Sequence, residues 1–446
     1  MSQLDTNENK MGVLPIPKLL LQMSLPMMLS MLVQALYNVV DSIFVARINE
    51  NALTAVSLVF PVQNLMIAIA VGTGVGVNAV LSRSLGEKDF HTANESAKNG
   101  IFLALISSII FALIGNLAAT FFFHIQTDDA QIRQYGISYM TIISTMCIAV
   151  YMQVMMERLL QSTGRTFYTM ISQGTGAIIN IILDPIFIFV LGMGAAGAAI
   201  ATVIGNIGAD LFFVFFLLTK SKRLSINPKG FFISKRELGD IFAIGIPASV
   251  TNFMQSLGIA LTNRFLLVYG TDKVASMGIV MKINMIAMLI LVGFAFGSQP
   301  LIGYNYGAGN KKRLKAILAF SYKFECAMGA VLALILCVFA KPLILMFMNQ
   351  ESIVNAGVPM LRLQLAGAVF TAVTLVSTCT FQSAGKALNA FLLSVSRQGV
   401  IFAVVIFILS KTVGYYGVLS AQPVSDFLTA VLAVILVRRS VYREIR

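Results

Sequence analysis

The chain is poor in charged side chains and in the residues that most often hold transition metals. Only 11% of its 446 residues are charged, while 57% are hydrophobic; a soluble globular domain carries about 25% charged residues. It has two histidines, and its four cysteines lie in apolar runs without C-x-x-C or zinc-ligand spacing. These shortages argue against a soluble protein and against a histidine-based metal hydrolase. They favour a chain that lies in a lipid bilayer.

Motifs for nucleotide or nucleic-acid chemistry are also lacking. The sequence contains no G-x-x-x-x-G-K-[ST] loop and no aspartate-rich prenyl-diphosphate motif. A nucleic-acid binder with the net charge of +13 would present a dense basic face on a soluble fold, and no segment here is large enough for a separate soluble domain. We therefore expect no enzyme activity, no cofactor and no nucleic-acid partner.

Long apolar runs divide the chain into membrane spans. A helix needs about 20 apolar residues to cross roughly 30 Å of hydrocarbon. Partition at charge clusters and Gly/Asn-rich breaks predicts twelve spans and hence an all-α, multi-pass protein of the cell membrane. The predicted limits are 19–46, 53–82, 97–122, 134–160, 166–191, 195–219, 238–268, 275–304, 315–340, 357–383, 387–411 and 414–437. The first run is longer than a signal-peptide core, so we expect it to be a retained span.

Positive charge is unevenly distributed over the predicted loops. With the N-terminus in the cytoplasm, most of the 32 Lys and Arg residues fall on the cytoplasmic side. The positive-inside rule therefore predicts that both termini are cytoplasmic. The polar connection 220–236 is the only one long enough to link two lobes, which gives an N-lobe over 1–219 and a C-lobe over 237–446.

An internal repeat relates these two lobes. Four sequence matches occur in the same order in both halves at offsets near 221 residues: Leu25-Pro26 with Ile246-Pro247, QSTGR at 161–165 with QSAGK at 382–386, Gly194-x-x-Gly197 with Gly414-x-x-Gly417, and Gly86 with Gly309 after a two-residue insertion. Because six spans precede the repeat, both halves have the same orientation in the membrane. Two parallel halves related by an axis along the membrane normal are a transporter design.

Polar residues of the N-lobe share one membrane depth. Asp41, Asp184 and Thr202 are predicted to lie roughly 8–11 Å below the outer end of their helices, and Tyr139 lies at the same level. Asn180 and Asp184 are four residues apart, so both project from one helix face. Carboxylate, amide and hydroxyl oxygens are hard ligands that suit Na⁺, and the same carboxylates can hold a proton instead. The alternative is that these groups only fix helix packing.

Three further carboxylates fall inside predicted spans without such clustering. Asp210 and Asp426 are expected to pair with helix ends or with nearby basic residues, and Glu325 has no predicted role. Lys282 and Arg397 are the basic residues deepest in the C-lobe spans.

A soft and polar stripe runs along the first span towards Asp41. Steps of three or four residues place its members on one helix face: Met23, Met27, Met31, Gln34, Asn38 and Asp41. The stripe predicts the lining of a cavity for varied ligands, because methionine repacks around different shapes; ordinary core packing is the alternative. The predicted substrate-contacting set is Met27, Met31, Gln34, Tyr37 and Asn38, joined by Asn252 and Gln255 from the second half.

Several motifs together resemble a known family. LYNVVDSIFVAR (36–47), NIILDPIFIF (180–189), QPLIGYNYGAGN (299–310) and the paired QSTGR/QSAGK are similar to the multidrug and toxic compound extrusion (MATE) family, especially its DinF/MepA-like branch. The resemblance covers nearly the whole chain. It implies a twelve-helix, two-lobe exporter driven by inward Na⁺ or H⁺, with Asp41, Asn180, Asp184 and Thr202 at the positions of the cation site.

The leading hypothesis is therefore a cation-coupled multidrug antiporter that exports cationic or amphipathic compounds. Its expected partners are small-molecule substrates and membrane lipid, and we expect a monomer. The second-lobe face that matches Asp41 carries no acid, so ion coupling is placed in the N-lobe alone. A flippase for a lipid-linked saccharide is the runner-up, although it should have a strongly basic cavity to hold diphosphate. A receptor or scaffold is the third class considered.

Overall fold

The chain is helical throughout the part that can be described. The computed structural model describes residues 9–48, 50–220 and 234–444, and every regular element in these ranges is a helix. A helix satisfies its own backbone hydrogen bonds, which is required where lipid offers no partners. The predicted all-α class is confirmed.

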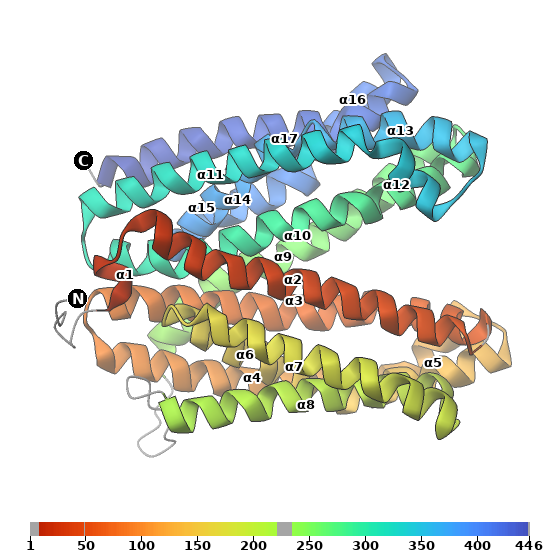
Figure 1. Cartoon of the computed structure of the whole chain (residues 1–446), viewed down its shortest axis with the longest axis horizontal. Coiled ribbons are helices and arrows are strands. Elements are labelled where there is room, and N and C mark those ends of the chain that lie inside the picture. Colours follow the sequence, from red (N-terminus) through yellow and green to blue (C-terminus); the bar gives the residue numbers. More distant parts are fainter. Residues whose placement is uncertain (1–8, 49, 221–233, 445–446) are drawn as a thin grey trace. The chain divides into compact units, whose positions relative to one another are not determined.

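Within the described residues, seventeen α-helices follow one another along the chain (Figure 1). In the first half they are α1 (Lys10–Val13), α2 (Ile16–Ala46), α3 (Glu50–Gly86), α4 (Phe90–Gln126), α5 (Ala130–Thr145), α6 (Cys147–Ser162), α7 (Thr166–Pro185) and α8 (Gly194–Lys220). In the second half they are α9 (Lys235–Leu267), α10 (Thr271–Gly307), α11 (Lys311–Val338), α12 (Ala340–Phe347), α13 (Glu351–Leu365), α14 (Ala368–Ser383), α15 (Ala387–Val395), α16 (Ile401–Thr412) and α17 (Tyr415–Val437). Short π-helical segments cover Ile186–Val190, Ser396–Val400 and Arg438–Tyr442.

The predicted spans correspond to these helices. Within the described residues, ten helices are long and apolar enough to cross a membrane. Two more spans result if α5 with α6 and α13 with α14 each count as one, although these pairs are bent by 46° and 42°. The twelve predicted spans are confirmed on that count, and the two bends were not predicted.

Helix positions repeat through the chain. Helices α5, α6 and α7 begin at Ala130, Cys147 and Thr166, and α13, α14 and α15 begin 221 residues later in each case. The internal duplication is therefore present in the structure as well as in the sequence.

One predicted match within the repeat is wrong. Helix α3 ends at Gly86 and α10 ends at Gly307, 221 residues later, so no insertion separates them. Gly309 instead corresponds to Lys88, and both residues take the left-handed backbone, with φ of 63° and 62°. The turn needs this conformation in both halves, and glycine adopts it without strain.

Contacts divide the chain into two compact units at points inside helices. The N-unit comprises Leu29–Ser249, and the C-unit comprises the chain up to Met28 together with Val250–Arg446. The boundaries lie within α2 and α9, each two residues after the helix proline Pro26 or Pro247. The predicted lobes, with boundaries at 219 and 237, differ from these units: the start of α2 belongs to the C-unit, and the start of α9 belongs to the N-unit. Most of the predicted connection 220–236 lies outside the described residues.

Glycines allow close contacts where the start of α2 packs in the C-unit and the start of α9 packs in the N-unit. In the N-unit, a Cβ on Gly72 of α3 would lie 2.6 Å from the carbonyl oxygen of Gly245, and the Ser249 hydroxyl donates to the carbonyl of Ala68 at 2.9 Å. In the C-unit, a Cβ on Gly293 of α10 would lie 2.6 Å from the Cα of Met28 in α2. The α3–α9 and α10–α2 contacts are thus equivalent positions of the repeat.

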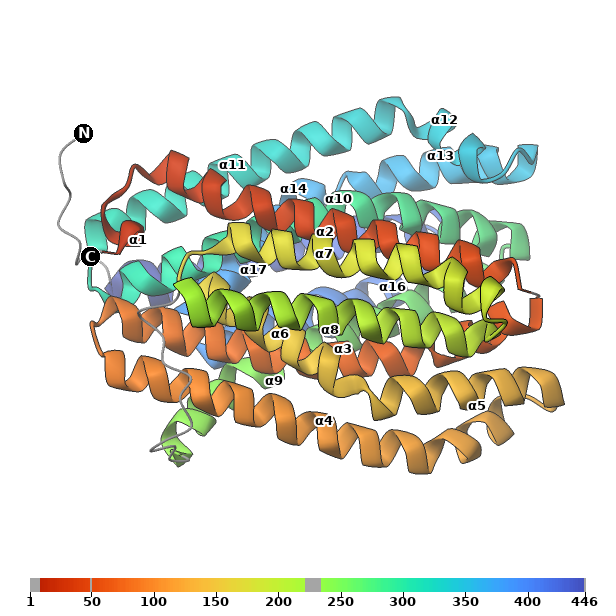
Figure 2. The same cartoon turned by 60° about the horizontal axis from the view of Figure 1, so that its bottom comes forward.

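Close helix packing also places the polar residues of the N-unit. Helices α7 and α8 lie side by side, and α6 contacts α8 (Figures 1 and 2). At the crossing of α7 and α8, a Cβ on Gly205 would lie 2.7 Å from the carbonyl oxygen of Gly176. Neither glycine has a side chain, so the backbones of α7 and α8 can approach closely at this point.

Candidate cation site

Helix α7 carries two of the predicted site residues on one face. Asn180 is 2% exposed and Asp184 is fully buried. Pro185 ends the helix, and the π-helical segment Ile186–Val190 begins at the next residue. The backbone is therefore irregular beside the buried carboxylate, as is common at functional positions of membrane helices.

A short hydrogen-bond network joins α7 to α8. The Asn180 amide nitrogen Nδ2 donates to Asp184 Oδ1 and to Thr202 Oγ1, each at 3.3 Å. The Thr202 hydroxyl donates to the carbonyl of Ala198 at 3.0 Å. The second oxygen of Asp184 and the Asn180 amide oxygen are buried and have no hydrogen-bond partner among the residues that the structure describes. Two acceptor atoms thus lack donors at one point.

Asp41 and Tyr139 belong to the same cluster. Asp41 Oδ1 is also buried without a partner, and its charge interacts with that of Asp184. Tyr139 is buried, accepts a hydrogen bond from Gln63 Nε2 at 3.3 Å, and interacts electrostatically with both aspartates. The structure therefore brings together all five predicted cation-site residues, the two aspartates with Tyr139, Asn180 and Thr202.

The charge of this cluster is not balanced by a basic residue. Among the described residues, the ion pairs within 4 Å include neither Asp41 nor Asp184. In the same part of the chain, no group of three or more His, Cys, Asp or Glu side chains is arranged to hold a metal ion. Two carboxylates with an amide and a hydroxyl oxygen form a hard, net acidic environment that fits a monovalent cation or a proton.

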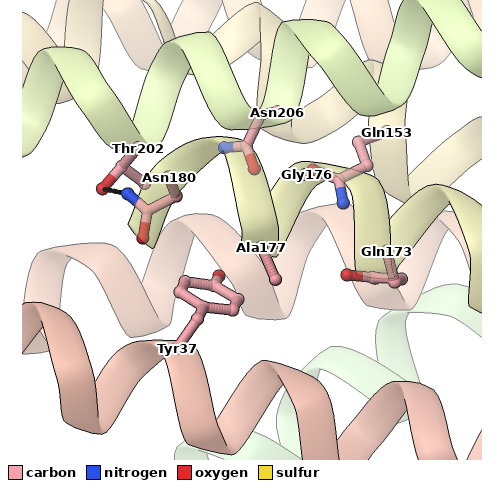
Figure 3. A pocket seen from close by; sticks show the side chains of 8 residues that line it. All are labelled: Tyr37, Gln153, Gln173, Gly176, Ala177, Asn180, Thr202 and Asn206. Carbon is pink, nitrogen blue, oxygen red and sulfur yellow. Dashed lines mark hydrogen bonds between the residues drawn. The ribbon is translucent and has the colours of Figure 1, made fainter. Parts of the chain in front are cut away.

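A small cavity opens beside the cluster (Figure 3). It is lined by side chains from α2, α6, α7 and α8: Tyr37, Gln153, Gln173, Gly176, Ala177, Asn180, Thr202 and Asn206. Its space suffices for about one water molecule. Tyr37, expected to contact substrate, here faces the space next to the predicted cation site.

The other predicted substrate residues differ in exposure. Met27 is fully buried and belongs to the part of α2 that packs in the C-unit, so it is a packing residue in this structure. Met31 and Gln34 are half-buried, and Asn38 is exposed. On α9, Asn252 is half-buried and Gln255 is exposed. The stripe therefore changes from packed to accessible near the unit boundary in α2.

The acid of the C-unit is held quite differently. Asp426 Oδ1 accepts from Arg397 Nε and from Gln422 Nε2, each at 2.9 Å, while Oδ2 accepts from the Thr371 hydroxyl at 3.1 Å. The expectation that Asp426 pairs with a basic residue is confirmed. Lys282 is exposed.

Two other buried carboxylates lack such a pair. Asp210 Oδ1 has no hydrogen-bond partner and Asp210 forms no ion pair among the described residues, so its expected pairing is not found there. Glu325 is fully buried, and neither of its oxygens has a partner.

Several polar residues near the cation cluster were missed from sequence. Glu157 is 5% exposed, and its carboxylate accepts from Gln161 Nε2 and Gln173 Nε2, each at 3.0 Å. Gln153, Glu157 and Gln161 follow steps of four residues, a signal that was available. The adjacent Arg158 also donates to Gln161, at 3.0 Å.

Fold and site together define a helical membrane protein of two homologous halves, with a buried, oxygen-rich cluster in one half. A family model described as MatE matches residues 26–186 and 247–408, which start at the two helix prolines. The chain belongs to this family, the MATE multidrug efflux transporters.

Two multidrug export proteins from staphylococci are similar to this chain over nearly its full length. It is 28% identical over 421 residues to the multidrug export protein MepA of Staphylococcus haemolyticus (strain JCSC1435), covering 94% of this chain and 93% of that protein. It is also 28% identical over 433 residues to MepA of Staphylococcus aureus (strain NCTC 8325 / PS 47), covering 95% and 94%.

Solved structures share the fold. One is the outward-facing conformation of a multidrug resistance MATE family transporter of the MOP superfamily, with a TM-score of 0.93 at 24% identity and 99% of both chains covered. Another is a MOP superfamily transporter from Pyrococcus furiosus, with a TM-score of 0.93 at 25% identity and 100% of both chains covered.

Proposed function

We propose that this chain is a secondary active exporter of cationic and amphipathic compounds, driven by inward movement of Na⁺ or H⁺. The coupling cation binds in the N-unit between Asp41 and Asp184, with Asn180 and Thr202 supplying further oxygens. Both termini lie in the cytoplasm, as the distribution of basic residues predicts.

The unpartnered buried oxygens carry this proposal. Asp41 Oδ1, Asn180 Oδ1 and Asp184 Oδ2 are all buried acceptors to which no group in the described part of the chain donates. An uncompensated carboxylate inside a membrane costs about 2.5–3.5 kcal/mol on insertion scales, so it is retained where it has a function. A bound cation would satisfy all three atoms and neutralise the acidic charge.

Coupling requires that cation and substrate favour different arrangements of the protein. If the occupied site stabilises one state and the drug another, each ligand lowers the affinity for its competitor by the same factor. Export then follows from the ion gradient, without chemistry on the drug.

Reconstituted transport tests the proposal. Protein in liposomes is supplied with a fluorescent cationic dye, and Na⁺ and pH gradients are imposed separately. We expect wild-type transport to follow one of the two gradients. Asp184→Asn preserves shape but removes the charge, so gradient-driven transport should fall to the level of protein-free liposomes.

Asp240→Asn is the matched control. Asp240 is in the same unit but its side chain is 49% exposed, where it lies 3.8 Å from Arg83. Its neutralisation should leave transport unchanged, because exposed pairs contribute little. Undiminished gradient dependence in Asp184→Asn would refute the assignment of the site.

Export is favoured over lipid flipping by the state of the basic residues. A diphosphate-binding cavity needs basic side chains that are free to bind phosphate. Arg397 donates to Asp426 and, at 3.0 Å, to Thr371, which leaves it committed to an internal ion pair. A receptor or scaffold would have no need of the unpaired acids.

A further inference from the structure

Three helices of the N-unit each present a polar stripe. On α6 and α8 the stripes repeat every four residues, as Gln153, Glu157, Gln161 and as Thr202, Asn206, Asp210. On α7, Gln173, Asn180 and Asp184 are separated by seven and four residues. With 3.6 residues per turn, each set occupies one helix face.

These faces converge on the small cavity. Figure 3 shows Asn180 and Thr202 at one side of it and Gln153 and Gln173 at the other, with Ala177 between them. The cavity therefore adjoins two residues of the cation cluster on one side and two glutamines on the other. On α7, Gln173 and Asn180 are separated along the cavity by Gly176, which has no side chain, and by Ala177, which has only a methyl group.

Hydrogen bonds continue the line beyond the cavity. Gln173 Nε2 donates to Glu157 Oε2 at 3.0 Å, and Gln161 Nε2 donates to Glu157 Oε1 at the same distance. Glu157 thus accepts from two neutral amides and, among the described residues, forms no ion pair within 4 Å. The charge of the adjacent Arg158 also acts on this carboxylate. Because Arg158 forms no close ion pair with Glu157 among the described residues, Glu157 remains a position at which a cation can pause.

The line leads towards one membrane face. Gln173 lies about 10 Å along α7 from Asn180, on the side of the helix start. Glu157 lies five residues before Ser162, the last residue of α6, so it is about 8 Å from that end. The α6–α7 connection is cytoplasmic in the predicted orientation. The polar groups therefore span most of the distance from the cation cluster to the cytoplasm.

The C-unit offers an internal comparison. At an offset of 221, Glu157, Asn180 and Asp184 correspond to Thr378, Ile401 and Val405. The second half therefore has no carboxylate or amide at these three positions.

The C-unit counterpart of the cavity is also occupied. Gly176 corresponds to Arg397, and Asn206 corresponds to Asp426 at the local offset of 220. Where the N-unit has a cavity, the C-unit has the Arg397–Asp426 ion pair. In the C-unit, the ion pair thus fills the position that the cavity takes in the N-unit.

From this arrangement we propose that the coupling cation leaves the Asp41/Asp184 site through the N-unit itself. It moves past Asn180 and Gln173 to Glu157, which is the last carboxylate before the cytoplasm, and it does not need to cross the drug-binding space. This inference rests on the proposed function, since it concerns the route of the same cation.

The test separates cation binding from cation passage. Glu157→Gln, Asp184→Asn and the exposed control Glu87→Gln are purified, and binding of labelled Na⁺, proton release and dye binding are measured in detergent. Gradient-driven dye transport is then measured in liposomes. We expect Glu157→Gln to keep cation and dye binding within about twofold of wild type and to lose transport by about tenfold or more. Glu87→Gln should match wild type.

A second variant protects the test against misfolding. Ala177→Leu fills the cavity without changing any charge, and it should slow transport while cation binding remains. Wild-type transport rates in both Glu157→Gln and Ala177→Leu would refute the proposed route of the cation through the N-unit. Loss of cation binding in Glu157→Gln would also overturn it, because Glu157 would then belong to the binding site. Unaltered binding and transport in Asp184→Asn would instead refute the proposed function.

Discussion

Two buried aspartates illustrate two ways of keeping a carboxylate inside a membrane. Asp426 accepts hydrogen bonds from Arg397, Gln422 and Thr371, so its charge is compensated by fixed groups. Asp184 accepts from Asn180 alone, and its second oxygen has no partner. The first arrangement stabilises a fixed structure. The second leaves a position that an exchangeable cation can fill.

The fixed arrangement predicts a large stability effect. Asp426→Asn removes the charge that compensates Arg397, and breaking a buried pair costs about 3–5 kcal/mol. We expect a clear fall in the midpoint of thermal unfolding, followed by circular dichroism in detergent. Asp240→Asn, which alters a loose and exposed pair, should shift the midpoint little. Equal midpoints for the two variants would show that the Arg397–Asp426 pair contributes nothing to stability.

Sequence alone could predict the cation-site residues and their common depth in the membrane, but not which other polar residues lie next to them. The four-residue spacing of Asn180 and Asp184 and the depth of Asp41 were sufficient for the cation cluster. Glu157 shares a helix face with Gln153 and Gln161, which the sequence does indicate, but its contact with Gln173 of another helix cannot be predicted from that spacing. Rotation of one helix about its axis relative to the next is set by packing, and a single sequence does not encode it in a readable pattern.

At the scale of elements, glycine contacts decide how helices meet. Gly72 of α3 faces Gly245 of α9, and Gly293 of α10 faces Met28 of α2. The absence of a side chain lets backbones approach closely, which replaces the hydrophobic drive that lipid cannot supply. These contacts hold the two helix ends that are exchanged between the units.

Gly72→Ala should therefore destabilise the N-unit. The added methyl would lie 2.6 Å from a backbone oxygen that cannot rotate away, and overpacking of this kind costs about 1–3 kcal/mol. Gly278→Ala is the control, because a Cβ there meets nothing within 4 Å. Thermal unfolding should show a lower midpoint for the first variant only. A midpoint for Gly72→Ala equal to that of the control would contradict the close α3–α9 contact.

The bends between α5 and α6 and between α13 and α14 could not be predicted from the sequence. The break at Met146 has no proline or glycine beside it, so the apolar run from 134 to 160 resembles one straight span. The second break includes Gly367, where a Cβ would lie 2.9 Å from Asp426 Oδ2. A glycine at this position thus leaves room for the Asp426 carboxylate beside the bend.

For the whole molecule, duplication explains most of the architecture. Short matched motifs predicted the repeat, and equal offsets between helix starts confirm it. The family model matches once in each half. The division into units was harder to predict, because the chain passes from one unit to the other inside continuous apolar helices, at Met28 and Ser249.

Function follows from where the two halves differ. The N-unit has unpaired acids, a cavity and a polar line, whereas the equivalent region of the C-unit has an ion pair and apolar residues. A net charge of +13 and many apolar residues account for a membrane protein. The proposed coupling to an ion gradient rests on the few carboxylates without ion-pair partners among the described residues.

Cation binding to the purified protein tests the central claim most directly. Labelled Na⁺ binding and proton release on dye addition are measured at equilibrium for wild type and for Asp41→Asn. We predict that wild type binds one Na⁺ per chain, or releases one proton per chain, and that Asp41→Asn does neither while it still binds dye. Equal cation binding and proton release in the two proteins would contradict the account.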